Sequence, residues 1–169
     1  AQIIALDDIP RFSELGVIAS MQPVHATSDM NMAEDRIGPQ RIKGGYAWRR
    51  LLDSGAVIAS GSDFPVELPN PFHGLYAAVA RQDRAGMPED GWYADQAMTR
   101  AEALHSFTLA AAYAAHQEDR LGSLERGKWA DFIVVDRNYF EIPASEIDDI
   151  RVLQTWVGGK LVYEAGAGE

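Results

Sequence analysis

The fold of this chain is indicated most clearly by the stretch Gly55-Ala56-Val57-Ile58-Ala59-Ser60-Gly61-Ser62-Asp63-Phe64-Pro65. Its first half is a short apolar run between glycines, which is too short for a typical helix and is typical of a strand buried on both faces of a parallel sheet. Pro65 cannot continue a hydrogen-bonded ladder, so Asp63 lies where the strand ends and a loop begins. Because chemistry in parallel α/β folds gathers at the carboxyl ends of strands, Asp63 is a candidate functional residue. Its position is equally compatible with an aspartate that caps the next turn.

A second apolar run of the same kind covers residues 17–22 and ends at a proline. Between the two runs, residues 38–45 are rich in glycine, proline and basic groups, which indicates a loop. Residues 46–52 carry aromatic and aliphatic side chains at helical spacing. The order of strand, helical crossover and strand predicts one right-handed parallel unit over residues 17–60.

Three further helices are indicated by their end signals. The first is expected over residues 7–15, where an aspartate can act as the N-cap, a proline suits the first turn and a glycine follows the end. The second is expected over residues 74–84, after a loop interrupted by prolines. The third begins at the capping box Thr99-Arg100-Ala101-Glu102 and is expected to continue to about His116.

The character of the sequence changes near residues 118–122, which predicts a unit of strands and helices over 1–120 and a second unit over 121–169. Apolar runs at 133–135 and 152–157 read as strands, and a third strand follows at 161–163. Gly158-Gly159 is a two-residue hairpin turn between the last two. The second unit is therefore expected to be all-β.

Composition excludes several classes of function. The net charge of −10 and the pI of about 4.8 argue against nucleic acid as a partner, because phosphate binding needs a basic face. There is no apolar run long enough to cross a bilayer and no signal peptide, so no membrane partner is expected. The absence of cysteine excludes disulfides and thiolate metal sites and fits a cytoplasmic protein.

The predicted strands leave the sheet incomplete. Two parallel strands that are apolar on both faces need neighbours at both edges, and a whole eight-stranded α/β barrel typically takes about 250 residues. The 169 residues are therefore expected to be the C-terminal part of a larger α/β enzyme. A small complete α/β domain with an unusual sheet is the alternative.

Four stretches resemble family-3 amidohydrolases, which are metal-dependent hydrolases of the (β/α)8-barrel superfamily. Residues 15–25, reading Leu15-Gly16-Val17-Ile18-Ala19-Ser20-Met21-Gln22-Pro23-Val24-His25, resemble the seventh-strand region of that family. Gly61-Ser62-Asp63-Phe64-Pro65-Val66 resembles its eighth-strand motif, whose aspartate sits at the metal centre. Residues 122–136 are similar to the superfamily's return into its small β-sandwich, and residues 155–163 resemble its closing hairpin.

The resemblance implies an α/β fold made of the C-terminal portion of a (β/α)8 TIM barrel, about strands seven and eight with their helices, plus part of a small β-sandwich domain. It implies hydrolysis of a non-peptide C–N bond, in an amide or cyclic amide, of a small-molecule substrate. The cofactor would be a divalent metal, often zinc in this family, and most of its ligands would precede residue 1. The open strand edges would be covered by the remainder of the parent chain or by a homo-oligomer.

The resemblance also assigns the candidate site. Asp63 would touch the metal and act as general base and acid, since a carboxylate beside activated water can take its proton and pass it to a leaving amine. His25 would hydrogen-bond a substrate carbonyl or oxyanion, with a loop histidine bonded to backbone as the alternative. Gln22 would face the mouth of the barrel and bind substrate. The isolated chain is expected to lack catalysis and a tight metal site.

The remaining polar and aromatic candidates have simpler interpretations. His73 is expected to cap a helix or face solvent, and the Arg49-Arg50 pair to form a solvated face. The Trp92-Tyr93 pair is expected to serve packing. A different class of function, a binding or assembly module that pairs through open strand edges, stays open beside the enzyme. A complete small enzyme of another type is a third hypothesis.

Overall fold

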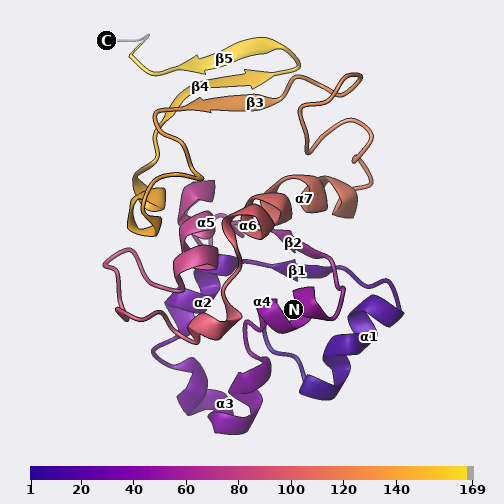
Figure 1. Ribbon diagram of the computed structural model, residues 1–169, viewed down its shortest axis with the longest axis vertical. Coiled ribbons are helices and arrows are strands. Elements are labelled where there is room, and N and C mark those ends of the chain that lie inside the picture. The colour runs from indigo at the N-terminus through magenta and orange to yellow at the C-terminus, as the bar shows by residue number, and fades with distance from the viewer. Residues whose placement is uncertain (167–169) are drawn as a thin grey trace.

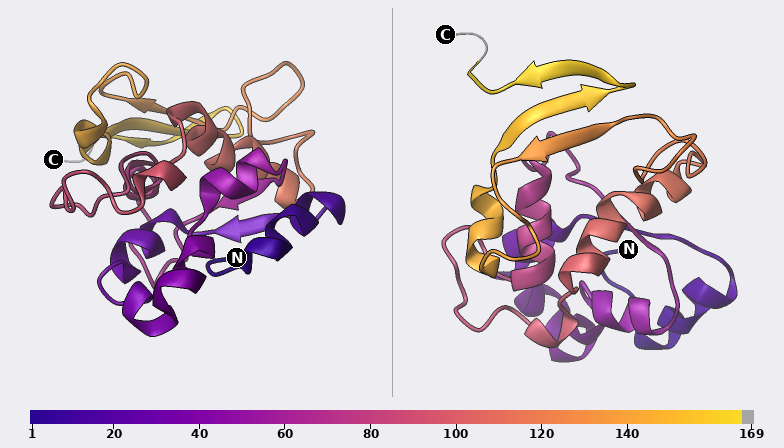
Figure 2. Two further views of the ribbon diagram at one scale, coloured as in Figure 1. Left: turned by 60° about the horizontal axis from the view of Figure 1, so that its bottom comes forward. Right: turned by 45° about the horizontal axis from the view of Figure 1, so that its top comes forward.

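The computed structural model describes residues 1–166, and its strands fall into two separate sheets (Figure 1). A parallel pair lies among helices, and an antiparallel three-stranded sheet lies beyond them. Two further views show this sheet on the far side of the later helices from the parallel pair (Figure 2). The helices are α1 (Ile9–Glu14), α2 (Pro23–Asp29), α3 (Ala33–Arg41), α4 (Trp48–Asp53), α5 (Pro71–Ala80), α6 (Arg100–Phe107) and α7 (Leu109–Ala114). The strands are β1 (Ala19–Met21), β2 (Ile58–Ser60), β3 (Phe132–Val135), β4 (Val152–Val157) and β5 (Lys160–Glu164). Short 3-10 turns are η1 (Leu6–Asp8), η2 (Ile42–Gly44), η3 (Ala94–Gln96) and η4 (Ala144–Asp149).

The parallel pairing predicted from the two apolar runs is confirmed. Ala19 of β1 pairs with Ile58 of β2, and Met21 pairs with Ser60. The ladder continues past the strands, where the Gly61 amide donates to the Met21 carbonyl at 3.1 Å. The carboxyl ends of β1 and β2 therefore lie side by side, and the segments that follow the two strands leave the sheet at the same end.

The crossover between β1 and β2 is more helical than the sequence predicted. Helix α2 begins at Pro23, directly after β1, because a proline at the first helical position loses no hydrogen bond there. The predicted loop at 38–45 is wrong in the same way, since α3 continues to Arg41 across a kink and η2 follows. The kink lies at Gly38, whose φ of 78° only glycine adopts without strain.

Close backbone approach requires a second glycine in this region. The segment 2–4 runs beside Gly44 and Gly45, where the Ile4 amide donates to the Gly44 carbonyl at 2.9 Å. A Cβ at Gly44 would lie 1.9 Å from the Ile4 carbonyl oxygen, so no side chain fits there. This contact holds the start of the chain against the crossover.

The later helices keep their predicted order with shifted ends. Helix α5 starts and ends several residues before the predicted range 74–84, because the Asn70 side chain accepts from the Phe72 amide at 3.0 Å and caps it. The capping box at Thr99 and Glu102 is confirmed. The predicted single helix to about His116 is wrong, since Thr108 leaves helical geometry (φ −121°, ψ −90°) and separates α6 from α7. Its hydroxyl donates to the Leu104 carbonyl at 2.7 Å instead.

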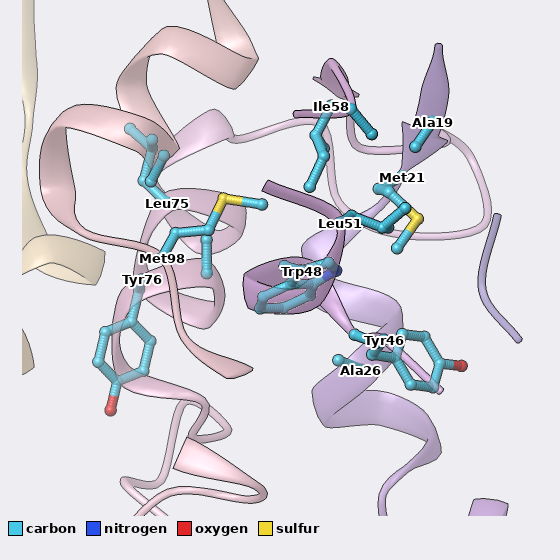
Figure 3. Close-up of a cluster of buried hydrophobic side chains, with 14 of the residues drawn as sticks. Ala19, Met21, Ala26, Tyr46, Trp48, Leu51, Ile58, Leu75, Tyr76 and Met98 are labelled. Carbon is cyan, nitrogen blue, oxygen red and sulfur yellow. The ribbon is translucent and has the colours of Figure 1, made fainter. Parts of the chain in front are cut away.

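The core lies between the parallel pair and helices α4 and α5 (Figure 3). Trp48 and Leu51 of α4 and Met21 of β1 are fully buried, and Leu75 of α5 is nearly so. Arg81 is also fully buried, with its guanidinium 4.4 Å from the Trp48 ring centre and bonded to the Trp92 and Tyr46 carbonyls at 2.8 and 3.0 Å. Burial lowers the pKa of Arg81 to about 10. A cation thus ties the two loops that contain Tyr46 and Trp92 to the core, and Trp92 serves packing as expected.

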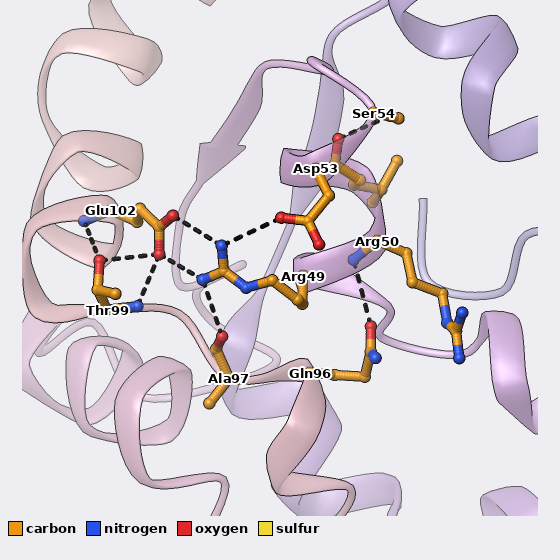
Figure 4. A network of polar contacts seen from close by, with 9 residues as sticks. Arg49, Arg50, Asp53, Ser54, Gln96, Ala97, Thr99 and Glu102 are labelled. Atoms are coloured by element: carbon orange, nitrogen blue, oxygen red, sulfur yellow. Dashed lines mark hydrogen bonds and ion pairs between the residues drawn. The ribbon is translucent and has the colours of Figure 1, made fainter.

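The interpretation of Arg49-Arg50 as a solvated face is wrong for Arg49 (Figure 4). Its guanidinium binds both carboxylate oxygens of Glu102 on α6, one of them at 2.8 Å, and donates to the Ala97 carbonyl at 3.2 Å. This bidentate ion pair is favoured because the capping box already fixes the Glu102 carboxylate in place. Arg50 points to solvent and remains exposed.

The C-terminal strands form one antiparallel sheet in the order β3-β4-β5. The hairpin at Gly158-Gly159 is confirmed, and both glycines have positive φ (55° and 74°), as a primed turn requires. The turn η4 packs this region against α5, with Ile147 fully buried. The predicted unit 121–169 extends past the described residues by its last three positions.

His73 lies within α5 and is not an exposed cap, which corrects that prediction. Its Nε2 is 3.5 Å from Asp148 Oδ1 of η4, and the Arg84 Nε donates to the other oxygen of Asp148 at 2.8 Å. Burial is the largest cause that lowers the pKa of His73. The three side chains join α5 to the C-terminal region. Within residues 1–166, no helix is long and apolar enough to cross a membrane.

Candidate active site at the carboxyl ends of β1 and β2

The two parallel strands bring His25 and Asp63 together. His25 lies in the first turn of α2, just after β1, and Asp63 lies three residues after β2. Their side chains approach to 3.6 Å between His25 Nε2 and Asp63 Oδ2. His25 lies on a helix, which argues against the alternative of a loop histidine. The parallel pairing of β1 and β2 thus brings together two residues that are 38 positions apart in the sequence.

The two side chains differ in their exposure to solvent. The His25 side chain is 12% exposed, whereas the Asp63 side chain is 50% exposed. The distance of 3.6 Å is too long for a hydrogen bond, and His25 Nε2 is buried without a partner among the described residues. An imidazole nitrogen and a carboxylate oxygen thus face the same small space with bonding capacity left over.

The backbone leaves the extended conformation of β2 at Asp63. Asp63 has a left-handed conformation (φ 60°), which aspartate tolerates better than most residues. Its carbonyl accepts from the Val66 amide at 2.8 Å, which closes a turn. The Glu67 side chain of the same loop accepts from Ser28 of α2 at 2.6 Å. The loop after β2 is thereby tied to the helix that carries His25.

Gln22 lies at the same end of the sheet but makes a different contact. It precedes α2, is half-buried, and its carbonyl accepts from the His25 amide at 3.0 Å. Within residues 1–166, its side chain forms no hydrogen bond with His25 or Asp63. Its predicted role in binding substrate stays a prediction.

Gln2 contacts the site, and sequence reasoning missed it. Its side-chain Nε2 lies 2.6 Å from His25 Nδ1, the ring nitrogen that points away from Asp63. The Gln2 carbonyl accepts from the Tyr46 amide at 2.7 Å, which anchors this segment beside the crossover. No spacing or periodicity signals the contact, because it joins an extended segment to a helix across the end of β1.

A second carboxylate on α2 is occupied elsewhere. Asp29 closes the helix and accepts a hydrogen bond from the Tyr46 hydroxyl. Burial, together with this bond, raises the pKa of the Tyr46 phenol. Asp29 is therefore a structural acceptor and not a free carboxylate of the site.

The residues present suit a share of a divalent metal site. Asp63 offers a carboxylate with no hydrogen-bond donor within bonding distance in the described chain, and the neighbouring His25 Nε2 is unpartnered. Among residues 1–166, no group of three or more histidines, cysteines or acidic residues could hold a metal ion. Typical zinc sites use four ligands, so Asp63 fits as one donor of a larger set.

Comparison with known proteins gives a consistent assignment. The sequence pattern of the amidohydrolase family matches residues 1–163. Protein LONG AFTER FAR-RED 3 of Arabidopsis thaliana is 35% identical over 164 residues, which are 96% of this chain and 28% of that protein. The N-substituted formamide deformylase of Arthrobacter pascens is 36% identical over 116 residues, which are 69% of this chain and 21% of that enzyme. The chain thus spans less than a third of the length of each of these two relatives.

A solved structure shows the same arrangement of elements. An uncharacterized metal-dependent hydrolase from Pyrococcus horikoshii OT3 superposes with a TM-score of 0.73 at 29% sequence identity. The match covers 85% of this chain and 29% of that one.

Proposed function

This chain belongs to the amidohydrolase family, and from that premise we propose that it is the catalytic-carboxylate segment of a metal-dependent hydrolase that cleaves a non-peptide C–N bond. The observation that carries the proposal is the approach of His25 Nε2 to Asp63 Oδ2, 3.6 Å apart at the carboxyl ends of adjacent parallel strands. In α/β barrels the reacting groups lie at the carboxyl ends of the strands.

The proposed architecture assigns β1 and β2 as strands seven and eight of a (β/α)8 barrel. The outer edges of the pair have no strand beside them within residues 1–166, which supports further strands on both sides in the whole protein. The sheet β3-β4-β5 is proposed to be part of a β-sandwich, with the division between the two units near residues 120 and 121.

Asp63 is proposed to carry the proton through the reaction. Its Oδ2 accepts a proton from the attacking water as the water oxygen bonds to the substrate carbonyl carbon. The same proton then passes to the substrate nitrogen as the C–N bond breaks, which releases an amine and a carboxylic acid and restores the carboxylate. Its 50% exposed side chain supports this role, because both water and substrate can reach it.

His25 is proposed to hold the substrate oxygen. Its buried, unpartnered Nε2 can donate to a carbonyl placed beside Asp63 and donate more strongly as negative charge develops there. Gln22, at the end of β1, is proposed to contact the substrate at the same mouth. The partner is a small molecule in this proposal, and relatives such as the formamide deformylase suggest amides as the first compounds to assay.

A divalent cation, for which we propose zinc, supplies Lewis acidity and makes water reactive near neutral pH. Asp63 is the donor that this chain contributes to it. Other donors complete the set in the proposal, because one carboxylate is fewer than a typical zinc site uses.

Asp63→Asn tests the function in the metal-loaded whole protein, which supplies the other metal donors of the proposal, assayed against a panel of N-substituted formamides and cyclic amides. The variant keeps the shape of the side chain and removes the proton acceptor, so kcat should fall about 10²–10⁴-fold. Asp53→Asn is the matched control, because Asp53 is an exposed aspartate at the end of α4. Equal turnover in both variants would remove Asp63 from the mechanism.

The alternative, a non-catalytic module that pairs through open strand edges, has one observation in its favour. Every residue of β5 is exposed, and only β4 pairs with it among the described strands. Sedimentation of this chain at several concentrations tests the alternative. Reversible association supports the assembly module, and a stable monomer argues against it.

A further inference from the structure

We propose that Gln2 is a positioning residue that fixes the neutral imidazole of His25 in the tautomer protonated at Nε2, the nitrogen that faces Asp63. The proposal rests on the proposed function, because it explains how His25 would have a proton to donate there. The observation is the 2.6 Å contact between Gln2 Nε2 and His25 Nδ1. The amide nitrogen can only donate, so Nδ1 must accept and the single ring proton belongs on Nε2.

The opposite orientation of the Gln2 amide is electrostatically unfavourable. If Oε1 faced His25, Nδ1 would carry the proton and Nε2 would be a bare acceptor. That lone pair would then lie 3.6 Å from Asp63 Oδ2 with no donor between them among the described residues. Two acceptors facing each other repel, whereas an Nε2–H attracts the carboxylate. His25 Nε2 is itself buried, so the water that reaches the half-exposed Asp63 does not hydrate this nitrogen.

Gln2 is held firmly enough to impose this choice. Its carbonyl accepts from the Tyr46 amide at 2.7 Å, and Ile3 forms an isolated bridge with Gly45. On the other side, the His25 amide is bonded to the Gln22 carbonyl at 3.0 Å in the first turn of α2. The side-chain bond thus joins two backbone segments that are each fixed by hydrogen bonds. In many functional histidines, a hydrogen bond to one ring nitrogen sets the tautomer and so fixes what the other ring nitrogen can do.

The tautomer can be read directly from ring 15N chemical shifts in the metal-free protein. The chain has four histidines, so 15N labelling of histidine gives four ring systems, and the one lost in His25→Asn is that of His25. The spectrum is recorded well above the ordinary titration range of histidine, near pH 8.5, where a free imidazole with a pKa of about 6.5 is neutral. We expect a protonated Nε2 and an unprotonated Nδ1. A protonated Nδ1 in this spectrum, in a neutral or a charged ring, would overturn the proposal without any variant.

Gln2→Glu then tests the cause. The side chain keeps its length, but a carboxylate can only accept, so the proton should move to Nδ1 of His25. Gln40→Glu is the matched control, because Gln40 is exposed on α3 and bonded only to Lys43 among residues 1–166. The His73 ring signals serve as an internal check of folding. Gln2→Leu, which neither donates nor accepts, is the second variant if the charge disturbs folding, and it should leave a mixture of tautomers. An unchanged His25 ring in both Gln2 variants would overturn the proposal.

Activity gives an independent readout in the metal-loaded protein. Loss of the outer partner of a site residue typically costs about 10–100-fold, and here the loss should fall on kcat with KM nearly unchanged, because the donor acts on developing charge. The two proposals fail separately. Normal turnover in Asp63→Asn removes the proposed function and leaves the tautomer measurement standing, whereas a protonated Nδ1 removes the role of Gln2 and leaves the role of Asp63.

Discussion

The parallel strand pair and the C-terminal sheet are stabilised by different means. Around β1 and β2, side chains such as Met21, Trp48 and Leu51 are fully buried, and even Arg81 is inside. In β5 every residue is exposed, and Val162 is 60% exposed. The first region is held by packing, and the second by its hydrogen-bonded ladder and by η4. The candidate site grows from the packed region, where a side chain at a strand end inherits the rigidity of the core.

The largest expected effect comes from replacing one tryptophan in each region. The two replacements test whether side-chain packing stabilises the first region more than the second. Trp48→Ala removes a fully buried ring and its contact with the Arg81 guanidinium, so the free energy of unfolding should fall by about 3–5 kcal/mol. Trp129→Ala, in the segment that leads into β3, removes a ring that is 52% exposed, and the change should stay within about 0.5 kcal/mol. Urea unfolding followed by circular dichroism measures both. Equal losses would show that burial does not distinguish the regions.

A glycine in the packed region gives the next largest effect. Gly44→Ala places a Cβ 1.9 Å from the Ile4 carbonyl oxygen, and the backbone must separate to relieve the clash. We expect a loss of about 1–3 kcal/mol, as for other overpacked positions. Gly61→Ala is the control, because nothing lies within 4 Å of its Cβ. If Gly44→Ala were as stable as this control, the start of the chain would not be held against the crossover.

The sequence predicted those parts of the fold whose signals are local. The alternation of short apolar runs with glycine and proline placed β1, β2 and the hairpin at Gly158-Gly159. The capping box of Thr99 and Glu102 predicted the start of α6. These features depend on residues a few positions apart, so they can be recognised without knowing what lies across the fold.

The misplaced features depend on tertiary contacts or on ambiguous residues. Proline is equally compatible with the end of a strand and with the first position of a helix. The sequence therefore did not predict that α2 begins at Pro23, immediately after the strand. Nothing in the local sequence around Arg81 signals burial, yet two tryptophans and two carbonyls surround it. The bond from Gln2 to His25 crosses 23 residues and follows no period. Asp63 could be proposed from sequence because a strand end is a local feature.

A pH series on Glu102 sharpens the comparison through a surface link between α4 and α6. The Arg49 guanidinium is the main cause that lowers the pKa of Glu102 from its ordinary 4.5 to about 2. The unfolded state therefore binds more protons between these values, so the contribution to stability is complete above about pH 4.5 and is lost as pH falls towards 2. Because the pair is partly exposed, we expect about 1 kcal/mol. Glu102→Gln should remove this contribution and flatten the profile, while Glu141→Gln, at an exposed position in the C-terminal region, should retain it.

The smallest expected effect comes from within the C-terminal sheet, where a double-mutant cycle measures what its side chains add to the ladder. Phe132 of β3 and Trp156 of β4 are cross-strand partners, with ring centres 5.6 Å apart and planes 10° from parallel. Truncating both to alanine, singly and together, should reveal a coupling of about 0.2–1 kcal/mol, which is typical of such pairs.

The matched cycle pairs Trp156 with Val162, an exposed residue of β5 that is not its register partner. Its coupling should be close to zero. A coupling between Phe132 and Trp156 well above 1 kcal/mol would mean that the sheet has a packed interior of its own, and the contrast between the two regions would then fail. A coupling no larger than that of the matched pair would leave backbone hydrogen bonds and the η4 contact as the causes of its stability. The first outcome would also change where rigid positions for functional side chains are expected. The carboxyl ends of β1 and β2 are favoured as such positions only while their core is better packed than the C-terminal sheet.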